Sequence, residues 1–291
     1  MLDILVDVIG PIAVVALIGW MWGRARQPFD TLSFSMVASY VGTPCLIVDS
    51  LATSGLRADG LAAMGLGATL CTLLALAAGF LLVIVSRQPV STYLPASTFA
   101  NCGNIGLPLA LFAFGKEGMA LAIAYLSVHG LFNFVIGQAL AAGRFSLRET
   151  LVSPLLWATA LGAVLSATGT ALPLSVGRAA HILGGLTIPM MLLALGYSLT
   201  KLRVTSLAWP LAFSALRLLG GFAIGWGVAL ALGLTGVARG VLVIESAMPV
   251  AVYNYMFAAR FDNRPEDVAG LVVLSTILAI GALPAFLLTV M

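Results

Sequence analysis

Long runs of apolar residues recur from one end of the chain to the other, and short polar segments separate them. Each run is long enough for an α-helix of about 20 residues, which crosses the hydrocarbon core of a bilayer. The alternation of apolar and polar positions that marks the strands of a membrane β-barrel is absent. The pattern therefore predicts an all-α integral membrane protein with ten transmembrane helices, at residues 2–22, 32–52, 61–85, 91–114, 118–142, 151–172, 180–200, 206–233, 238–261 and 268–290.

The composition agrees with this pattern and excludes a water-soluble domain. Hydrophobic residues make up 61% of the 291 positions and charged residues only 9%, whereas soluble domains carry roughly a quarter charged residues. The three cysteines, Cys45, Cys71 and Cys102, lie in apolar runs without paired spacing, so we expect small core residues and no metal site. The first residues lack a basic segment and include Asp3 and Asp7, so the first run is expected to remain as an anchor.

The basic residues are distributed unevenly between the two ends of the predicted helices. Nine lie in loops at one end, namely Arg24, Arg26, Arg87, Arg144, Arg148, Lys201, Arg203, Arg260 and Arg264. Four lie at the other end, namely Arg57, Lys116, Arg178 and Arg239, and Arg217 lies within a predicted helix. Short loops rich in Lys and Arg stay in the cytoplasm. We therefore expect a multi-pass protein of a bacterial inner membrane with both termini outside.

The two halves of the chain resemble each other. The second helix contains "YVGTPCLIVDSL" and the seventh contains "LTIPMMLLALGYSL", with Pro44 and Pro189 in the middle of the span. Pro108 in the fourth helix and Pro249 in the ninth follow at nearly the same separation. Because five is an odd number of crossings, the second copy is expected to be inverted in the membrane. The sequence thus predicts two inverted five-helix repeats, residues 1–150 and 151–291, an arrangement typical of secondary transporters.

The fourth and ninth helices are predicted to be interrupted. The stretch "ANCGNIGLP" (residues 100–108) places two asparagines, two glycines and a proline in one run: Asn101, Gly103, Asn104, Gly106 and Pro108. Unwound chain survives at membrane depth only where it lines protein or a wet cavity. Half-helices that begin near Leu107 and at Pro249 would direct two N-termini toward one point. Such a crossing suits an anion, and a carboxylate in particular, to which asparagine amides can donate.

Several polar side chains within the predicted helices are candidates for a site. Glu245 lies four residues before Pro249, and a carboxylate at this depth is a functional candidate, as a proton carrier or as a sodium ligand. Arg217 is expected to pair with Glu245, to counter the charge of the substrate, or to hold the bundle together. Asn133, Gln138, Tyr253 and Asn254 are expected either to line the cavity or to form hydrogen bonds between helices.

At these residues the chain resembles the auxin efflux carrier family, which includes plant auxin carriers and bacterial permeases for malonate and related carboxylates. The similar stretches are "TFANCGNIGLPLALFAFG", "YLSVHGLFNFVIGQ", "LTIPMMLLALGYSL" and "ESAMPVAVYNYMFAARF". The resemblance implies ten helices in two inverted repeats, with broken helices 4 and 9 crossing at mid-membrane. It also implies an elevator-like moving bundle, homodimers, and Asn101 as the first carboxylate ligand. It places His129 at a position that faces the pocket, with a packed core histidine as the alternative.

We therefore expect a secondary transporter of small organic anions, either mono- or dicarboxylates such as malonate, malate or auxin-like acids. The expected partners are this anion, the bilayer and a second copy of the chain, with no nucleic acid and no cofactor besides a coupling proton or sodium ion. The alternative is a sodium-coupled symporter of larger, bile-acid-like anions. An enzyme is not expected because HExxH, GxSxG and Walker motifs are absent, and opposed broken helices favour alternating access over a passive channel.

Overall fold

The computed structural model describes residues 2–53, 58–145, 151–200 and 208–291. Arg57, Arg148, Lys201 and Arg203, which contribute to the predicted charge asymmetry, lie outside the described residues. The secondary structure of the described ranges is helical, and the one extended pairing in them is an isolated antiparallel bridge between Ala100 and Val250. The helical class predicted from the apolar runs is therefore confirmed.

The helices follow the predicted apolar runs, and four of them contain a π-helical turn (η). They are α1 (Leu2–Arg24), α2 (Thr31–Val37), η1 (Ala38–Gly42), α3 (Thr43–Thr53), α4 (Ala58–Ser86), α5 (Val90–Thr98), η2 (Cys102–Gly106), α6 (Leu107–Phe132), η3 (Asn133–Gly137), α7 (Gln138–Ala142), α9 (Pro154–Thr168), α10 (Leu174–Gly185), α11 (Thr187–Leu199), α12 (Ala208–Ala215), η4 (Leu216–Gly220), α13 (Gly221–Ala231), α14 (Gly236–Ser246), α15 (Val252–Arg260) and α16 (Pro265–Val290).

Within the described ranges, five continuous helical stretches are long and apolar enough to cross a membrane, and Val8–Arg24 and Pro154–Thr168 are shorter apolar helices. One of the five, Cys102–Ala142, turns back on itself at Gly115, where φ is 65° and ψ is −155°. A Cβ on Gly118 would lie 2.8 Å from the carbonyl oxygen of Ala110, a contact that a straight helix cannot make. Only glycine adopts this φ readily, and the loop predicted between residues 114 and 118 is therefore present.

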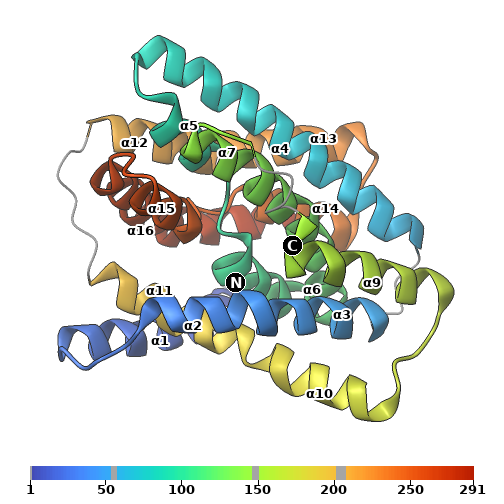
Figure 1. Ribbon diagram of the computed structural model, residues 1–291. Coiled ribbons are helices and arrows are strands. Elements are labelled where there is room, and N and C mark those ends of the chain that lie inside the picture. Colours follow the sequence, from blue (N-terminus) through green and yellow to red (C-terminus); the bar gives the residue numbers. More distant parts are fainter. Residues whose placement is uncertain (1, 54–57, 146–150, 201–207) are drawn as a thin grey trace.

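The helices form two groups, which Figure 1 shows in its lower and upper halves. In the lower group α1 packs along α11, and α3 packs along both α9 and α10. In the upper group α4 packs against α5 and α13, α13 against α14, and α12 against α16. Helix α6 contacts members of both groups, including α4 and α14 on one side and α1, α3 and α9 on the other.

Glycines allow the closest of these helix contacts. A Cβ on Gly225 of α13 would lie 3.0 Å from the Cα of Val243 and would collide with the hydroxyl of Ser246 in α14. Gly221, one turn earlier, lies against the carbonyl oxygen of Ser246. Small residues let helix backbones approach closely in membranes, and here they press α13 against the end of α14.

The mid-span prolines of the two repeats, Pro44 and Pro189, lie near the starts of helical segments. Pro44 is the second residue of α3, and the chain before it stays helical through the π-turn η1. Pro189 is the third residue of α11, and the helix is interrupted earlier, at Leu186. Neighbouring helices and local π adjustments satisfy the backbone groups that a proline frees in a membrane helix. Pro44 therefore lies within a continuous helical run, and Pro189 lies in the first turn of α11.

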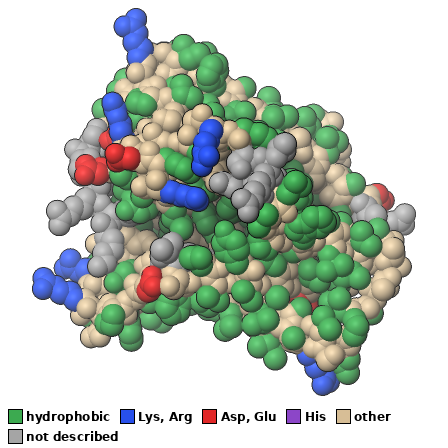
Figure 2. Space-filling view, viewed as in Figure 1, with side chains coloured by type: hydrophobic (Ala, Val, Ile, Leu, Met, Phe, Trp, Pro, Cys, Tyr) green, Lys and Arg blue, Asp and Glu red, His purple; other side chains and the backbone are tan. Residues whose placement is uncertain are grey.

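The surface fits a lipid environment. Large apolar side chains are exposed along the helices, among them Leu81 (64% exposed), Trp157 (62%) and Ile182 (68%). Figure 2 shows hydrophobic side chains over most of the visible face, with Lys and Arg mainly in its left half. The loops from α1 to α2 and from α15 to α16 lie at that left end, and the loops from α9 to α10 and from α13 to α14 lie at the right.

Candidate functional site

The first interruption is the extended segment Phe99–Asn101, between the end of α5 at Thr98 and the π-turn η2. Asn101 caps η2 because its Oδ1 accepts a hydrogen bond from the N–H of Asn104 at 3.3 Å. The carbonyl oxygen of Asn101 accepts from the N–H groups of Ile105 and Gly106, each at 3.3 Å. The helix therefore restarts at Cys102, five residues before the predicted start near Leu107, because the asparagine cap satisfies the first turn.

The second interruption is residues 247–251, between α14 and α15. Pro249 lies within it, and α15 begins three residues later, at Val252. The side-chain amide of Asn254 donates to the carbonyl oxygen of Phe99 at 3.1 Å, and the N–H of Val250 donates to Ser275 Oγ at 3.0 Å. The backbone around Val250 is extended because it pairs with the first interruption, so the helix starts later than the predicted position at Pro249.

The two interruptions meet and pair with each other. The N–H of Asn101 donates to the carbonyl oxygen of Pro249 at 2.7 Å, and the N–H of Ala251 donates to that of Phe99 at 3.1 Å. These bonds form the antiparallel bridge between Ala100 and Val250, whose side chains are 5% and 0% exposed. Each unsatisfied backbone group costs several kcal/mol in hydrocarbon. The interruptions are therefore stable because each satisfies the other.

Arg217, in η4, binds the C-terminal ends of both half-helices. Its guanidinium donates to the carbonyl oxygens of Ser97 (3.2 Å) and Thr98 (2.6 Å) at the end of α5, and to that of Ser246 at the end of α14. The side chain is 2% exposed. Helix C-termini carry partial negative charge, so a buried cation fits here. Of the three roles open for Arg217, these contacts support the one in which it holds the bundle together. Among the described residues, Arg217 makes no ion pair with Glu245.

The crossing therefore joins four helix ends, two more than the pair of N-termini predicted from the sequence. The C-terminal ends of α5 and α14 face Arg217. The N-terminal ends, η2 and α15, begin immediately after each interruption. An anion is accordingly favoured only on the side of the crossing where η2 and α15 begin.

Glu245 lies in the last turn of α14 and is fully buried. Its carboxylate rests against Gly106, where an added Cβ would collide with both of its oxygens. Neither oxygen has a hydrogen-bond partner in the described part of the chain. The Sγ of Cys102 donates to the main-chain oxygen of Glu245 at 3.6 Å. A buried ionised carboxylate without a partner is very costly, so this position suits a proton or a bound cation.

His129 stabilises the first interruption through a hydrogen bond to its backbone. Its Nε2 accepts a hydrogen bond from the N–H of Ala100 at 2.9 Å, and its Nδ1 lies 2.8 Å from Thr72 Oγ1. The hydroxyl of Thr72 itself donates to the carbonyl oxygen of Ala68, so Nδ1 is the protonated nitrogen of a neutral ring. Both ring nitrogens are thus occupied by protein, as in the packed-core alternative.

A pocket beside the crossing lies between the two helix groups. Asn104 and Tyr253 line it from the crossing, with Val252 and Met256 of α15. The opposite wall comes from α2, η1 and α11, and consists of Phe34, Ala38, Ser39, Met190, Met191 and Ala194. Asn101, His129, Asn133 and Asn254 are not among its lining residues. Met190, Met191 and Ala194 lie in the stretch "LTIPMMLLALGYSL", but the sequence did not indicate that they line a pocket, because each is ordinary in an apolar helix.

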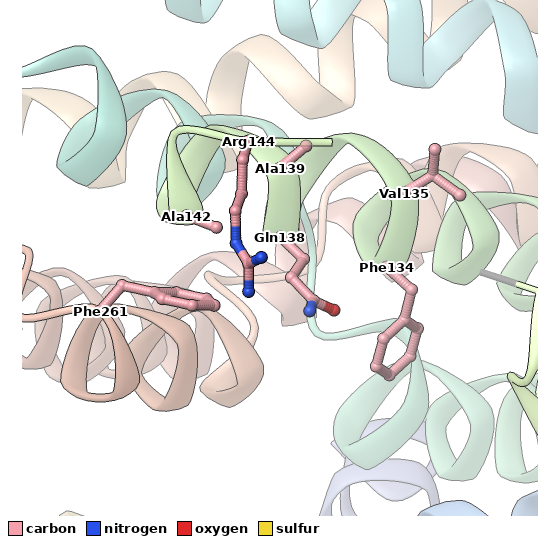
Figure 3. Close-up of a pocket in the computed structure, with 7 residues that line it drawn as sticks. All are labelled: Phe134, Val135, Gln138, Ala139, Ala142, Arg144 and Phe261. Atoms are coloured by element: carbon pink, nitrogen blue, oxygen red, sulfur yellow. The ribbon is translucent and has the colours of Figure 1, made fainter. Parts of the chain in front are cut away.

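The remaining predicted polar residues, Asn133 and Gln138, do not line this pocket. Asn133 is buried in η3, and its Oδ1 has no hydrogen-bond partner among the described residues. Gln138 lines a different pocket with Arg144, between α7 and the end of α15 (Figure 3). The two pockets adjoin, because the ring of Phe134 in the second lies 5.6 Å from that of Tyr253 in the first.

Comparisons with known proteins place the chain among membrane transporters. The model of the membrane transport protein family, which is the auxin efflux carrier family, matches residues 138–287. The chain belongs to this family, as its motifs indicated.

Two relatives are themselves described as uncharacterized transporters. One, from Methanothermobacter thermautotrophicus, is 27% identical over 270 residues, which cover 88% of this chain and 87% of the relative. The other, from Methanocaldococcus jannaschii, is 25% identical over 191 residues, 62% of each chain. The protein is thus a multi-pass membrane protein of a transporter family.

Proposed function

We propose that the protein is a secondary active transporter that carries small organic anions through the pocket beside the helix crossing. The observation that carries this proposal is the position of Asn104 and the first turn of α15 on one wall of a pocket whose other wall belongs to the second helix group. Unpaired N–H groups of a helix N-terminus and a neutral amide attract a carboxylate without a competing charge.

The lining of the pocket favours an acid with one carboxylate and an apolar body. Its polar side chains are Asn104, Ser39 and Tyr253, and none of its lining residues is charged. Phe34 and three methionines, Met190, Met191 and Met256, supply the apolar walls. A second carboxylate, as in malonate or malate, would have to lose its water against these side chains, which is costly. Within the expected range of acids, we therefore favour auxin-like monocarboxylates.

Alternating access by an elevator motion is the transport mechanism that we propose. The pocket lies between the two helix groups, so a displacement of one group along the other would change the side from which it opens. The pairing of helices supports two inverted repeats at 1–150 and 151–291 with ten crossings. In such a repeat the first crossing, α1, corresponds to the sixth, α9. The second crossing, which includes α3, corresponds to the seventh, which includes α11. The contact of α1 with α11 is therefore matched by the contact of α9 with α3.

Glu245 is the proposed coupling residue. It is buried beside the crossing and its carboxylate lacks a partner among the described residues, so it fits a proton that is carried with the substrate. Sodium is the alternative ion, with larger, bile-acid-like anions as the substrate. A pH gradient that drives uptake in the parent but not in Glu245→Gln supports the proton, and a sodium requirement lost in the same variant supports the alternative.

We also propose a homodimer in a bacterial inner membrane with both termini outside. The family resemblance supports the dimer, and the arginines at one end of the described chain support the orientation. Cross-linking in membranes tests the first, and labelling of cysteines added to the termini with an impermeant reagent tests the second.

Uptake into proteoliposomes tests the substrate proposal. Labelled acetate, hexanoate, phenylacetate, malonate and malate are compared under the same pH gradient, and sodium-driven taurocholate uptake tests the alternative. We expect phenylacetate and hexanoate to accumulate more than the dicarboxylates, and Asn104→Ala to reduce that uptake. If no acid moves under any gradient, the proposal is wrong.

A further inference from the structure

We propose that the pocket between α7 and the end of α15 is a second anion site, where Arg144 binds the carboxylate of the substrate outside the pocket at the crossing. The proposal rests on the proposed function, because it assumes that the same organic acid occupies both pockets. It adds a separate binding site, with its own residues, to the one described above.

The lining of this second site combines a cation with aromatic rings. Its residues are Phe134, Val135, Gln138, Ala139, Ala142, Arg144 and Phe261. Figure 3 shows the Arg144 side chain extending from the segment after α7 into the space between the ring of Phe261 and the side chain of Gln138. A guanidinium presents a fork of N–H donors that matches a carboxylate. Phe134 and Phe261 form the aromatic part of this lining, against which the apolar remainder of an acid such as phenylacetate would pack.

The second site adjoins the crossing through an aromatic contact. The ring of Phe134 meets that of Tyr253 at 5.6 Å and 64°, and that of Phe257 at 6.0 Å and 78°. Phe134 lines the second site, and Tyr253 lines the pocket at the crossing. One ring contact therefore joins a residue of the second site to a residue of the pocket at the crossing.

The two sites differ in charge in a way that suits successive binding. The pocket at the crossing has no charged lining residue, whereas the second site has Arg144, which is exposed to the surroundings. A charge at an accessible position captures an anion that still retains part of its water. The uncharged pocket then receives it through neutral donors. Arg144 is accordingly a substrate-binding residue for entry or exit at the arginine-rich end of the molecule.

Protection of an engineered cysteine tests the site without requiring transport. Ala142, which lines the second site, is replaced by cysteine in a Cys45→Ala background, where Cys71 and Cys102 are buried. The rate of alkylation by a maleimide is measured in detergent with increasing phenylacetate. We expect phenylacetate to slow alkylation. The Arg144→Gln substitution should raise the apparent Kd for phenylacetate about two- to fivefold, the range for loss of an exposed ion pair. Arg87→Gln, which removes an exposed arginine outside the site, is expected to leave that Kd unchanged.

The outcomes separate this proposal from the proposed function. Protection that persists in Asn104→Ala and weakens in Arg144→Gln supports a second site, even if uptake of every acid is absent and the proposed function fails. Absence of protection, or equal protection with and without the Arg144 guanidinium, refutes the second site. Uptake of phenylacetate in that case leaves the proposed function intact.

Discussion

Replacement of Arg217 by methionine tests whether the guanidinium holds the crossing together. Methionine keeps the apolar stem and removes three hydrogen bonds, to the carbonyl oxygens of Ser97, Thr98 and Ser246. Each bond to a charged group is worth at least about 1.5 kcal/mol, and the acceptors are left buried, so the free energy of unfolding should fall by about 4–5 kcal/mol. With about 2–4 °C per kcal/mol for a chain of this size, Tm should fall by about 10 °C or more.

The assay follows the cysteines near the crossing with a thiol-reactive dye during heating in detergent. Cys71 and Cys102 are 2% and 0% exposed, so in a Cys45→Ala background the dye reports loss of the packed core. Arg217→Lys should recover part of the loss, because an ammonium is a point charge and cannot span carbonyls of two helices as a guanidinium does. Arg87→Met serves as the surface control. A Tm within about 2 °C of the parent together with abolished uptake would refute this account and make Arg217 a counter-charge for the substrate.

Three further substitutions test individual contacts. Gly106→Ala should lower both Tm and phenylacetate uptake, because its methyl group collides with the Glu245 carboxylate. The double variant Gly106→Ala/Glu245→Ala should recover Tm but not uptake, and an unchanged Tm in Gly106→Ala would contradict the contact. His129→Ala should cost about 1–3 kcal/mol in denaturant unfolding because the N–H of Ala100 loses its acceptor, and His129→Gln should recover part of this loss. Asn104→Asp should raise the KM for phenylacetate at least about tenfold with unchanged Tm, since it places a like charge in the pocket, and an unchanged KM would place the substrate elsewhere.

Proline alone did not predict where helices are interrupted. Pro11, Pro95 and Pro284 lie inside helices. Neighbouring helices and local adjustments satisfy the backbone groups that such a proline frees. The two interruptions occur where extended backbone pairs across the crossing, and Asn101 caps the helix that follows the first of them. The motif around Asn101 was therefore informative, whereas a mid-span proline such as Pro44 or Pro189 does not mark an interruption of this kind.

The hydrophobic pattern could not reveal the π-turns. Each of η1, η2, η3 and η4 inserts one residue into a helical turn without changing the apolar character of the run. Such turns are frequent at functional sites, and here η2 follows the first interruption while η4 carries Arg217. Their effect is to rotate side chains that composition alone had placed on a regular helix.

The candidate site was predicted only in part because many of its contacts involve backbone atoms. The chemistry of Asn101 and Glu245 was visible as polar residues in apolar runs. The acceptors of Arg217 are carbonyl oxygens, which any residue supplies, so no sequence signal pointed to them. The opposite wall of the pocket was not predicted either, because Met190 and Ala194 are ordinary residues of an apolar helix, even though they lie in a stretch that carries the family resemblance.

The bridge between Ala100 and Val250 has a consequence for biogenesis. The hydrogen-bond partners of Phe99 and Asn101 are residues 251 and 249, which the ribosome adds about half a chain later. Until then, the polar backbone of the fourth helix enters the membrane without its final partners. Insertion factors, lipid headgroups or water must solvate it during synthesis. A chain truncated before residue 249 therefore retains backbone groups at Phe99 and Asn101 without their hydrogen-bond partners.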